Sequence, residues 1–234
     1  MKNMIEEFRN HFDDVVESVE RYDIFVRGRE FQEQSLALLR PLLNECRENK
    51  ERAIKNSQED AANAFLAFEY MAASLMEEFR FYLALKDDKV DQAWDHLINA
   101  ESAAANAMKS HQVAAHLTNY IERLDALESL LFPKPAFFST GWVVHRSECS
   151  ICGVEYGECD HIKGRPYMGQ LCARVVKEGT AKEVSVVSDP ADKHCRAMHF
   201  SDDDKWRNAF THRIVPPESV DHPPKSRTLE GRIS

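Results

Sequence analysis

The sequence predicts an α+β protein, in which an N-terminal antiparallel helical bundle or helical-hairpin array precedes a small antiparallel β domain stapled by zinc. Three observations lead to this fold class. Apolar residues recur at helical spacing over the first half of the chain, the composition changes at Pro133, and four cysteine and histidine residues gather at 149–161. We therefore expect a helical part at 1–135, a zinc-binding β domain at 136–214, and an extended or disordered tail at 215–234.

The helical part contains five segments in which apolar side chains recur three or four residues apart. This spacing places them on one face of a helix, with charged residues opposite. Gly28 separates the first two segments, and Pro41 indicates a kink or an early end within the second. Asp87 and Asp88 mark a turn and a candidate N-cap, and Pro133 ends the fifth helix. The five stripes are Ile5, Phe8, Phe12, Val15, Val19 and Tyr22; Phe31, Leu38, Leu42 and Cys46; Phe65, Phe68, Ala72, Leu75 and Phe79; Val90, Trp94, Leu97, Ala100 and Ala104; and Leu117, Ile121, Leu124, Leu127 and Leu131.

Short links between these segments favour antiparallel neighbours. The charged stretch 48–60 fits either a helical extension or a loop. Beyond Pro133, aromatic and β-branched residues predict a first strand within 137–144 and further strands at 170–176 and 182–187. About 60 residues with modest apolar content often need a metal or a disulfide to form a stable domain. The sequence thus predicts a small antiparallel sheet that depends on a metal ion.

The pattern C-x2-C-x6-C-x-H comprises Cys149, Cys152, Cys159 and His161. Structural Zn²⁺ binds four cysteine or histidine side chains in a tetrahedron, and the C-x2-C half suits a tight turn with both thiolates facing one ion. Gly153 can supply the positive φ that such a turn often needs. We predict a structural zinc ion at these four residues. The alternatives are unrelated free cysteines beside a surface histidine, or a redox C-x2-C motif, which normally opens a helix after a strand.

Four further residues contain potential metal donors: Cys172, His194, Cys195 and His199. They could form a second metal site, or one of them could supply a spare ligand to the first. For Cys172, packing beneath the C-x2-C turn is the simpler explanation, because free cysteine usually behaves as a small buried apolar residue.

The composition bounds the partners of this 234-residue chain. A formal net charge of −9 argues against a general nucleic-acid binder, whose hallmark is a basic patch. No apolar run approaches the about 20 residues that cross a bilayer, so no membrane partner is expected. The N-terminal residues lack the pattern of a signal peptide, and we expect a cytoplasmic protein in which cysteines stay reduced.

The run from Cys149 to Gly164, then Tyr167-Met168-Gly169, Cys172, Glu183–Val187 and Pro190-Ala191, resembles a zinc-containing segment of phage prohead (head maturation) protease-like proteins and their uncharacterised bacterial relatives. The resemblance implies a phage-related module. Those proteases use a serine and a histidine, with the serine in a short Ser-x-Gly-Phe-like stretch upstream of the zinc. The only comparable upstream run here is 138–141, which contains Ser139. Ser185 falls within a predicted strand, without the neighbouring base that a nucleophile needs.

Two classes of function remain, with a nucleic-acid-binding zinc module ranked below both. The first is a zinc-binding protein-interaction protein, an adaptor or assembly factor, with a role in phage–host conflict as one setting. Its contact residues would include Tyr156, Tyr167 and Met168, although these could equally pack on the zinc loop. The alternative is a prohead-protease-like or metal-dependent hydrolase, which would need an open position on the metal. We predict a protein partner and no catalytic residues.

Overall fold

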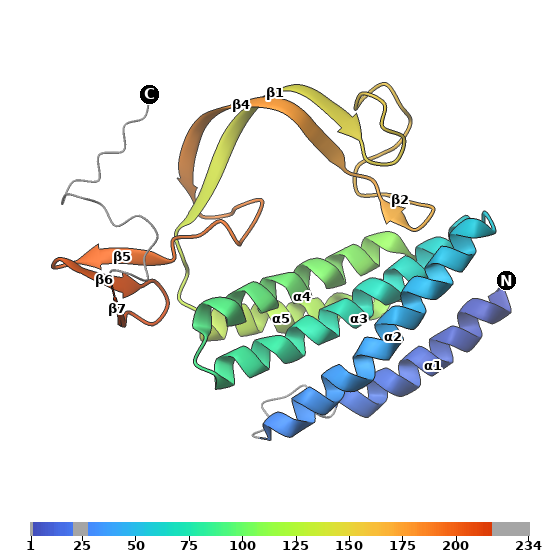
Figure 1. The fold of residues 1–234 in the computed structure, drawn as a ribbon, viewed down its shortest axis with the longest axis horizontal. Helices are drawn as coiled ribbons and strands as arrows, with labels where there is room; N and C mark the ends of the chain where they lie inside the picture. The colour runs from blue at the N-terminus through green and yellow to red at the C-terminus, as the bar shows by residue number, and fades with distance from the viewer. Residues whose placement is uncertain (1, 21–27, 217–234) are drawn as a thin grey trace. The chain divides into compact units, whose positions relative to one another are not determined.

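The computed structural model describes residues 2–20 and 28–216 and confirms the α+β class, with small antiparallel sheets following the helices (Figure 1). The helices are α1 (Lys2–Glu20), α2 (Arg29–Lys55), α3 (Glu59–Lys86), α4 (Val90–Ser110) and α5 (Thr118–Leu131), with the 3₁₀ helix η1 (Gln112–Leu117) before α5. The strands are β1 (Phe137–Cys149), β2 (Pro166–Tyr167), β3 (Gln170–Leu171), β4 (Arg174–Val187), β5 (His199–Asp202), β6 (Lys205–Asn208) and β7 (Ile214–Val215).

The five predicted helices are present, but the early end of α2 at Pro41 and the N-cap role at Asp87 and Asp88 are wrong, and the alternative of a kink at Pro41 stays a prediction. Helix α2 does not end early at Pro41 but continues to Lys55. Pro41 has no N–H to donate to the Ala37 carbonyl four residues earlier. Both residues are exposed, so water can bond to that carbonyl instead. The charged stretch 48–60 is accordingly mostly helix. Tyr22, assigned to the first apolar stripe, lies outside the described residues.

The turns that reverse the chain between α2, α3 and α4 each contain one residue with positive φ. Ser57 has φ 53° and Asp88 has φ 56°. In each turn the next N–H donates to a carbonyl five residues earlier, Gln58 to Ala53 and Lys89 to Ala84, both at 2.9 Å. This bonding terminates a helix with a left-handed residue. Asp88 therefore ends α3, and the predicted N-cap role is wrong, because Lys89 occupies that position without a side-chain cap.

Helix α3 is the centre of the helical part, because it packs against both α2 and α4 (Figure 1). Its buried side chains point in all directions and include Phe65, Phe68, Phe79 and Phe81. It also contains the buried carboxylate of Glu78, which is 1% exposed. Arg123 of α5 donates to both Glu78 oxygens, at 2.6 and 3.0 Å, and the Tyr82 hydroxyl donates at 2.9 Å. This ion pair ties α5 to α3. Within the described residues, none of the helices combines the length and apolarity of a membrane span.

The strands form three small sheets: β1 with β4, β2 with β3, and β5 with β6 and β7. The expected strand at 170–176 is interrupted at Cys172 and Ala173, and its second half joins the expected strand at 182–187 in one long β4. We call the antiparallel pair of β1 and β4 the ribbon (Figure 1). Strands β5 to β7 were not predicted. The tight turn between β5 and β6 uses Asp203 and Asp204 with φ 48° and 63°, where glycine or asparagine usually signals a hairpin.

The chain separates into two compact units. The first comprises residues 1–128 and 146–178, so it includes most of the helical part and the predicted zinc ligands. The second comprises residues 129–145 and 179–234, and its small core contains Phe132, Phe137 and Phe210. These two units do not divide the chain between residues 135 and 136, where the sequence analysis placed the domain boundary. Whether residues 1–135 and 136–214 fold independently stays a prediction. Of the predicted tail, Val215 belongs to β7, and residues 217–234 lie outside the described part.

Candidate metal centre

The connection between β1 and β4 contains all four predicted zinc ligands. Cys149 is the last residue of β1, Cys152 and Cys159 follow in the loop, and His161 precedes β2. We call residues 149–172 the metal segment and these four side chains the donor cluster. Three sulfurs and an imidazole nitrogen lie within 4.8 Å of one another, an arrangement that could hold one metal ion.

The backbone of the C-x2-C turn is folded around the first sulfur. The N–H of Ile151 donates to the Cys149 Sγ at 3.4 Å, and the N–H of Gly153 donates to the Cys149 carbonyl at 2.9 Å. The Cys149 N–H in turn donates to the Val154 carbonyl at 2.8 Å. Gly153 has φ 72°, as the sequence predicted, and this conformation costs glycine little. The turn thereby holds Cys149 and Cys152 beside each other.

The His161 side chain has the environment of a metal ligand. Its Nδ1 is buried and, among the described residues, has no hydrogen-bond partner. Its ring contacts that of Tyr167 edge-to-face, with 4.6 Å between centroids, and the Tyr167 hydroxyl accepts the Ile162 N–H at 2.9 Å. A buried nitrogen without a partner costs free energy that coordination of a metal would remove. The donor cluster therefore fits a metal ion both in its chemistry and in what it leaves unsatisfied.

Two thiols in and beside the cluster differ in acidity. Burial raises the pKa of Cys149, but hydrogen bonds from the backbone N–H groups of Cys152 and Ile151 outweigh it and lower the pKa to about 6. The Cys172 Sγ lies 3.8 Å from that of Cys149. Burial, and then the hydrogen bond to Cys149, raise the pKa of Cys172 to about 11. Cys149 therefore loses its proton first, and the thiolate is the form that binds metals.

A turn in the metal segment rests on the helices of the same unit. Met168 and Gly169 connect β2 to β3 with φ 46° and 77°. The Gly169 N–H donates to the Oδ1 of Asn63, a buried residue of α3, at 2.8 Å. A Cβ added at Gly169 would stand 3.1 Å from the Lys50 Cγ and 3.2 Å from the Ile54 Cδ1, both in α2. Only glycine fits the combination of this backbone conformation with so close an approach.

An ion pair on the helices supports this contact. The Lys50 ammonium lies 2.5 Å from one oxygen of Glu69, and the Arg47 guanidinium lies 2.8 Å from the other. Burial alone would raise the pKa of Glu69, but the hydrogen bonds from Lys50 and Arg47 lower it overall. The pair fixes the aliphatic stem of Lys50 beneath Gly169. Sequence reasoning missed this support, and the only signal for Asn63 is a polar residue inside an alanine-rich buried run.

The other residues singled out by the sequence lie apart from the donor cluster or beside it. Cys172 belongs to the first unit, whereas His194, Cys195 and His199 belong to the second. The His194 Nδ1 and the Cys195 Sγ both contact the Asp192 carboxylate, at 2.8 and 3.8 Å. Among the described residues, two groups of three or more potential metal donors lie within 4.8 Å of one another, and none of these four residues belongs to either group.

The residues suggested as partner contacts or nucleophiles have ordinary structural positions. Tyr167 packs on His161, and the Arg174 guanidinium lies over the Tyr156 ring at 5.7 Å from its centroid. Tyr167 thus packs within the metal segment, and Tyr156 packs against Arg174, the first residue of β4. Ser139 is half-buried in β1, and Ser185 is exposed in the middle of β4.

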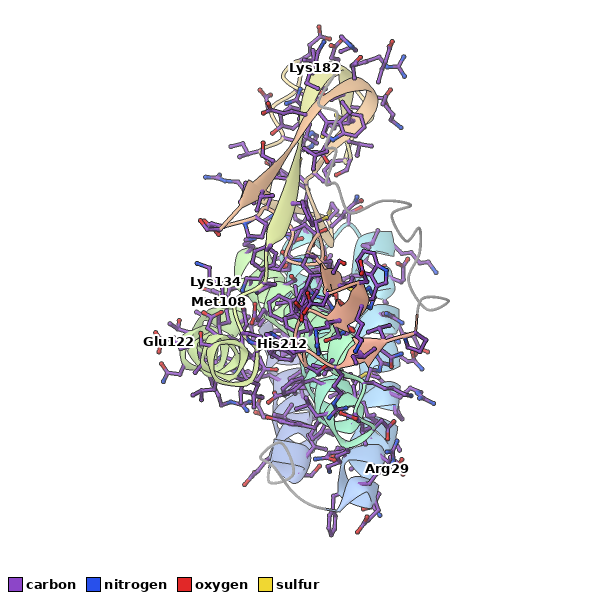
Figure 2. All side chains as sticks on the ribbon, turned by 90° about the vertical axis from the view of Figure 1, so that its left-hand side faces the viewer. Arg29, Met108, Glu122, Lys134, Lys182 and His212 are labelled. Atoms are coloured by element: carbon purple, nitrogen blue, oxygen red, sulfur yellow. The ribbon has the colours of Figure 1, made fainter. Side chains whose placement is uncertain are left out.

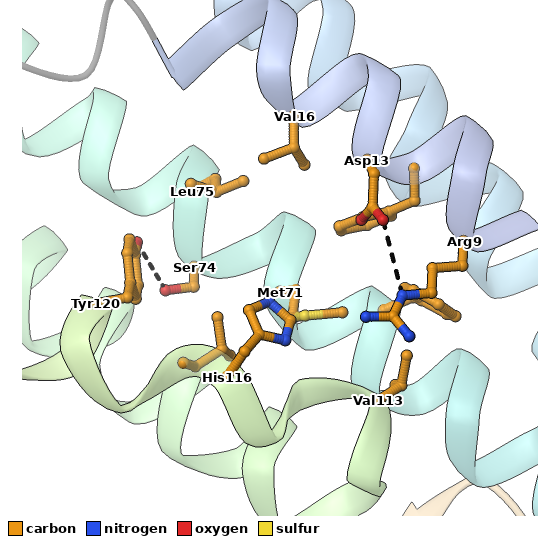
Figure 3. A pocket seen from close by; sticks show the side chains of 12 residues that line it. Arg9, Asp13, Val16, Met71, Ser74, Leu75, Val113, His116 and Tyr120 are labelled. Carbon is orange, nitrogen blue, oxygen red and sulfur yellow. Dashed lines mark hydrogen bonds and ion pairs between the residues drawn. The ribbon is translucent and has the colours of Figure 1, made fainter.

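Two other features of the first unit contain polar groups. Glu101, Asp125 and Glu128 bring their carboxylates within 4.8 Å of one another on α4 and α5, but only oxygen donors are present, and the soft sulfur donors that Zn²⁺ favours are absent from this group. A cavity of about 140 Å³ lies among α1, α3 and η1 (Figure 3). Its lining is largely apolar, with an ion pair between Arg9 and Asp13 and a 3.1 Å contact between the Ser74 and Tyr120 hydroxyl oxygens. These four polar groups are paired with one another, and the remaining polar lining residue, His116, is exposed, so the donor cluster is the better candidate site.

No family model matches this chain, and neither a curated protein nor a solved structure shows significant similarity to it. The function is therefore argued from the site and the surface alone.

Proposed function

We propose that this protein is a zinc-binding protein-interaction module, an adaptor or assembly factor, in which the zinc ion is structural. The observation that carries the proposal is the closed donor set, three cysteines and one histidine within 4.8 Å of one another. Borderline Zn²⁺ prefers this mixture of sulfur and nitrogen, whereas Ca²⁺ and Mg²⁺ take oxygen ligands. The relation to phage proteins stays a prediction from the sequence resemblance, which the neighbouring genes can check.

A structural role follows from the number of protein ligands. Catalytic zinc keeps one position for water or substrate, whereas four protein ligands complete a tetrahedron. The metal segment also needs a staple, because many of its side chains are exposed, including Val154 at 44% and Ile162 at 51%. A segment that buries so little apolar surface gains its folding free energy from the metal.

The surface best suited to a protein partner is one face of the ribbon in the second unit. A Cβ at Gly141 would lie 3.0 Å from the Glu183 Cγ, so odd-numbered residues of both strands share one face there. Even-numbered residues share the other, because side chains alternate along a strand. That second face includes Phe138, Trp142, Val184 and Val186, which are 39%, 57%, 63% and 70% exposed. Figure 2 shows side chains, Lys182 among them, extending from the ribbon into open space.

This face is mostly apolar, with Lys182 among its even-numbered residues, and within the described residues it is largely uncovered. A two-stranded ribbon is marginally stable in water by itself and gains stability when another element covers one face. Contiguous exposed apolar side chains often mark a protein interaction site. The exposed face thus supports the binding half of the proposal, as the donor cluster supports the zinc half.

The zinc half is tested by elemental analysis of the purified full-length protein. We expect one zinc per chain in the wild type and a loss of metal in Cys152→Ser, with hydrogen exchange rising across residues 149–172 while the helices stay protected. Cys195→Ser is the matched control, since it removes an exposed thiol of the second unit and should leave the zinc content unchanged. Wild-type protein without zinc would refute this half. Spectroscopy showing three protein ligands and a water would favour the hydrolase instead.

The binding half is tested by quantitative pull-down from the native cell. We expect Trp142→Ser and Val184→Ser to reduce recovery of a specific partner while zinc content and helicity stay unchanged. Leu130→Ser is the control, because Leu130 is an 80% exposed apolar residue outside the ribbon. Equal recovery with all three variants would show that the ribbon is not the contact surface.

A further inference from the structure

The metal segment contains a fifth potential ligand, Cys172. Its Sγ lies 3.8 Å from the Sγ of Cys149. Two thiolates bound to one tetrahedral Zn²⁺, each at about 2.3 Å, are separated by about 3.8 Å. The spacing of this thiol pair is therefore that of two ligands on a single ion.

The backbone of Cys172 is fixed on both sides. Its N–H donates to the Arg165 carbonyl at 2.8 Å, and its carbonyl accepts the Gly164 N–H at 2.8 Å. The residue is 2% exposed and directly follows β3, which is joined to β2 by the turn that rests on the helices. The position of the Cys172 thiol is thus held by the fold before any metal binds.

Cys159 is held less firmly. It is half-buried and follows an open stretch in which Gly157 has φ 108° and no atom within 4 Å of an added Cβ. The Tyr156 N–H donates to the Ser147 carbonyl at 2.8 Å and the Glu158 N–H to the Glu155 carbonyl at 3.0 Å, so the loop is anchored upstream, while the open space at Gly157 leaves the backbone before Cys159 room to adjust. Cys172 lies outside the donor cluster but within ligand spacing of Cys149, so a fixed thiol stands beside an adjustable one, Cys159, next to the same metal position.

We propose that Cys159 and Cys172 are alternative ligands for the fourth position on the metal. This inference rests on the proposed zinc site and adds that the centre exchanges one thiolate for another without losing the ion. Five donors then serve four positions, and either Cys159 or Cys172 is unbound at any moment. Such a centre tolerates the loss of either thiol and not of both.

The test compares Cys159→Ser, Cys172→Ser and the double variant in the full-length protein, with Zn²⁺ and with Co²⁺ as a spectroscopic substitute. We expect each single variant to retain one equivalent of metal. The double variant keeps only three protein donors and should lose the metal, because structural zinc needs four. Cys195→Ser controls for removing a thiol elsewhere. If either single variant loses as much affinity as the double variant, the alternatives do not exist.

A second readout is alkylation of the zinc-loaded wild type by N-ethylmaleimide, followed by mass spectrometry. We expect Cys159 to be labelled while zinc stays bound and while Cys149 and Cys152 stay protected. Protection of Cys159 equal to that of Cys152 would overturn the proposal, because it would show one fixed ligand set. Wild-type protein that binds no zinc would instead refute the zinc site itself, before any variant is compared.

Discussion

Helix α3 and strand β4 differ in how many of their side chains are buried. Helix α3 buries side chains on every face, from Phe65 to Phe81, and its one buried carboxylate is paired with Arg123. Strand β4 runs for 14 residues without a buried side chain. Burial of apolar surface is the main stabilising contribution to folding, so the helices are expected to be stable by packing. The ribbon and the metal segment bury little apolar surface, so their stability depends on turns, hydrogen bonds and the proposed metal.

The comparison teaches where substitutions in this protein should matter. In the helical part the effect of a change should follow burial and pairing. In the metal segment it should follow backbone conformation and donor atoms. In the ribbon it should be small, apart from binding. Four predictions test this ordering, from the largest expected effect on the free energy of unfolding to the smallest.

Arg123→Met should have the largest effect. It leaves the Glu78 carboxylate buried, 1% exposed, without its bidentate partner. Removing one partner of a buried ion pair typically costs about 3–5 kcal/mol. Urea denaturation followed by circular dichroism measures the loss. The double variant Arg123→Met with Glu78→Gln should recover part of it, and a single variant as stable as the wild type would show that the pair contributes nothing.

Gly169→Ala should destabilise the contact between the metal segment and the helices by about 1–3 kcal/mol. The new Cβ would be strained by the positive φ and would also meet Lys50 and Ile54 at 3.1 and 3.2 Å. Gly153→Ala is the matched control, since its φ is also positive but the space around it is open. Hydrogen exchange at residues 166–171 should rise more in Gly169→Ala. Equal effects would mean that the close approach to α2 is unimportant.

Acid should weaken the support beneath Gly169. The folded-state pKa of Glu69 is lowered by its hydrogen bonds to Lys50 and Arg47, against the effect of burial. A depressed pKa contributes stability above the unfolded-state value of about 4.3, and this contribution is lost as the pH falls through the folded pKa. We expect Glu69→Gln to remove about 1 kcal/mol or less at pH 7 and to flatten the decline of stability below pH 4.3. Parallel pH profiles for both proteins would contradict this.

Val186→Ala should have the smallest effect. Val186 is 70% exposed in β4, and exposed substitutions usually change the free energy of unfolding by less than about 0.5 kcal/mol. Thermal denaturation should therefore give nearly unchanged midpoints. A loss as large as that from a buried residue would show that something in the folded protein covers this face, and the contrast between α3 and β4 would fail.

The helices could be predicted because apolar residues three or four positions apart in the sequence lie on one face of a helix, and that face is the one buried. The stripe containing Phe65, Phe68 and Phe79 lies in the observed core. The four donors could be predicted because their chemistry is rare and their spacing short. The structure brings them within reach of one ion, and the identity of that ion stays a prediction.

The rest depends on contacts between residues far apart in the sequence, or on turns without a clear residue signal. Nothing local indicates that Asn63 accepts a hydrogen bond from Gly169, or that Arg123 reaches Glu78. The turn at Asp203 and Asp204 has positive φ at two aspartates, so no glycine marked the hairpin of β5 and β6. Pro41 indicated a kink or an early end of α2, and the helix does not end there, because its exposed position makes the missing hydrogen bond tolerable.

The absence of buried side chains in β4 has one more consequence, for the register of the ribbon. A shift of one residue between paired strands moves each side chain to the opposite face, and burial is what normally forbids it. Here hydrogen bonds at the end of the ribbon next to the metal segment restrain the register: the Ser150 N–H donates to the Ala173 carbonyl at 3.0 Å, the Ala173 N–H donates to the Ser150 hydroxyl at 2.8 Å, and the Arg174 guanidinium donates to the Ser147 hydroxyl at 2.8 Å. Cys149 and Cys172 directly precede Ser150 and Ala173 in the chain. A metal ion at the donor cluster would hold this end of the ribbon in its observed register.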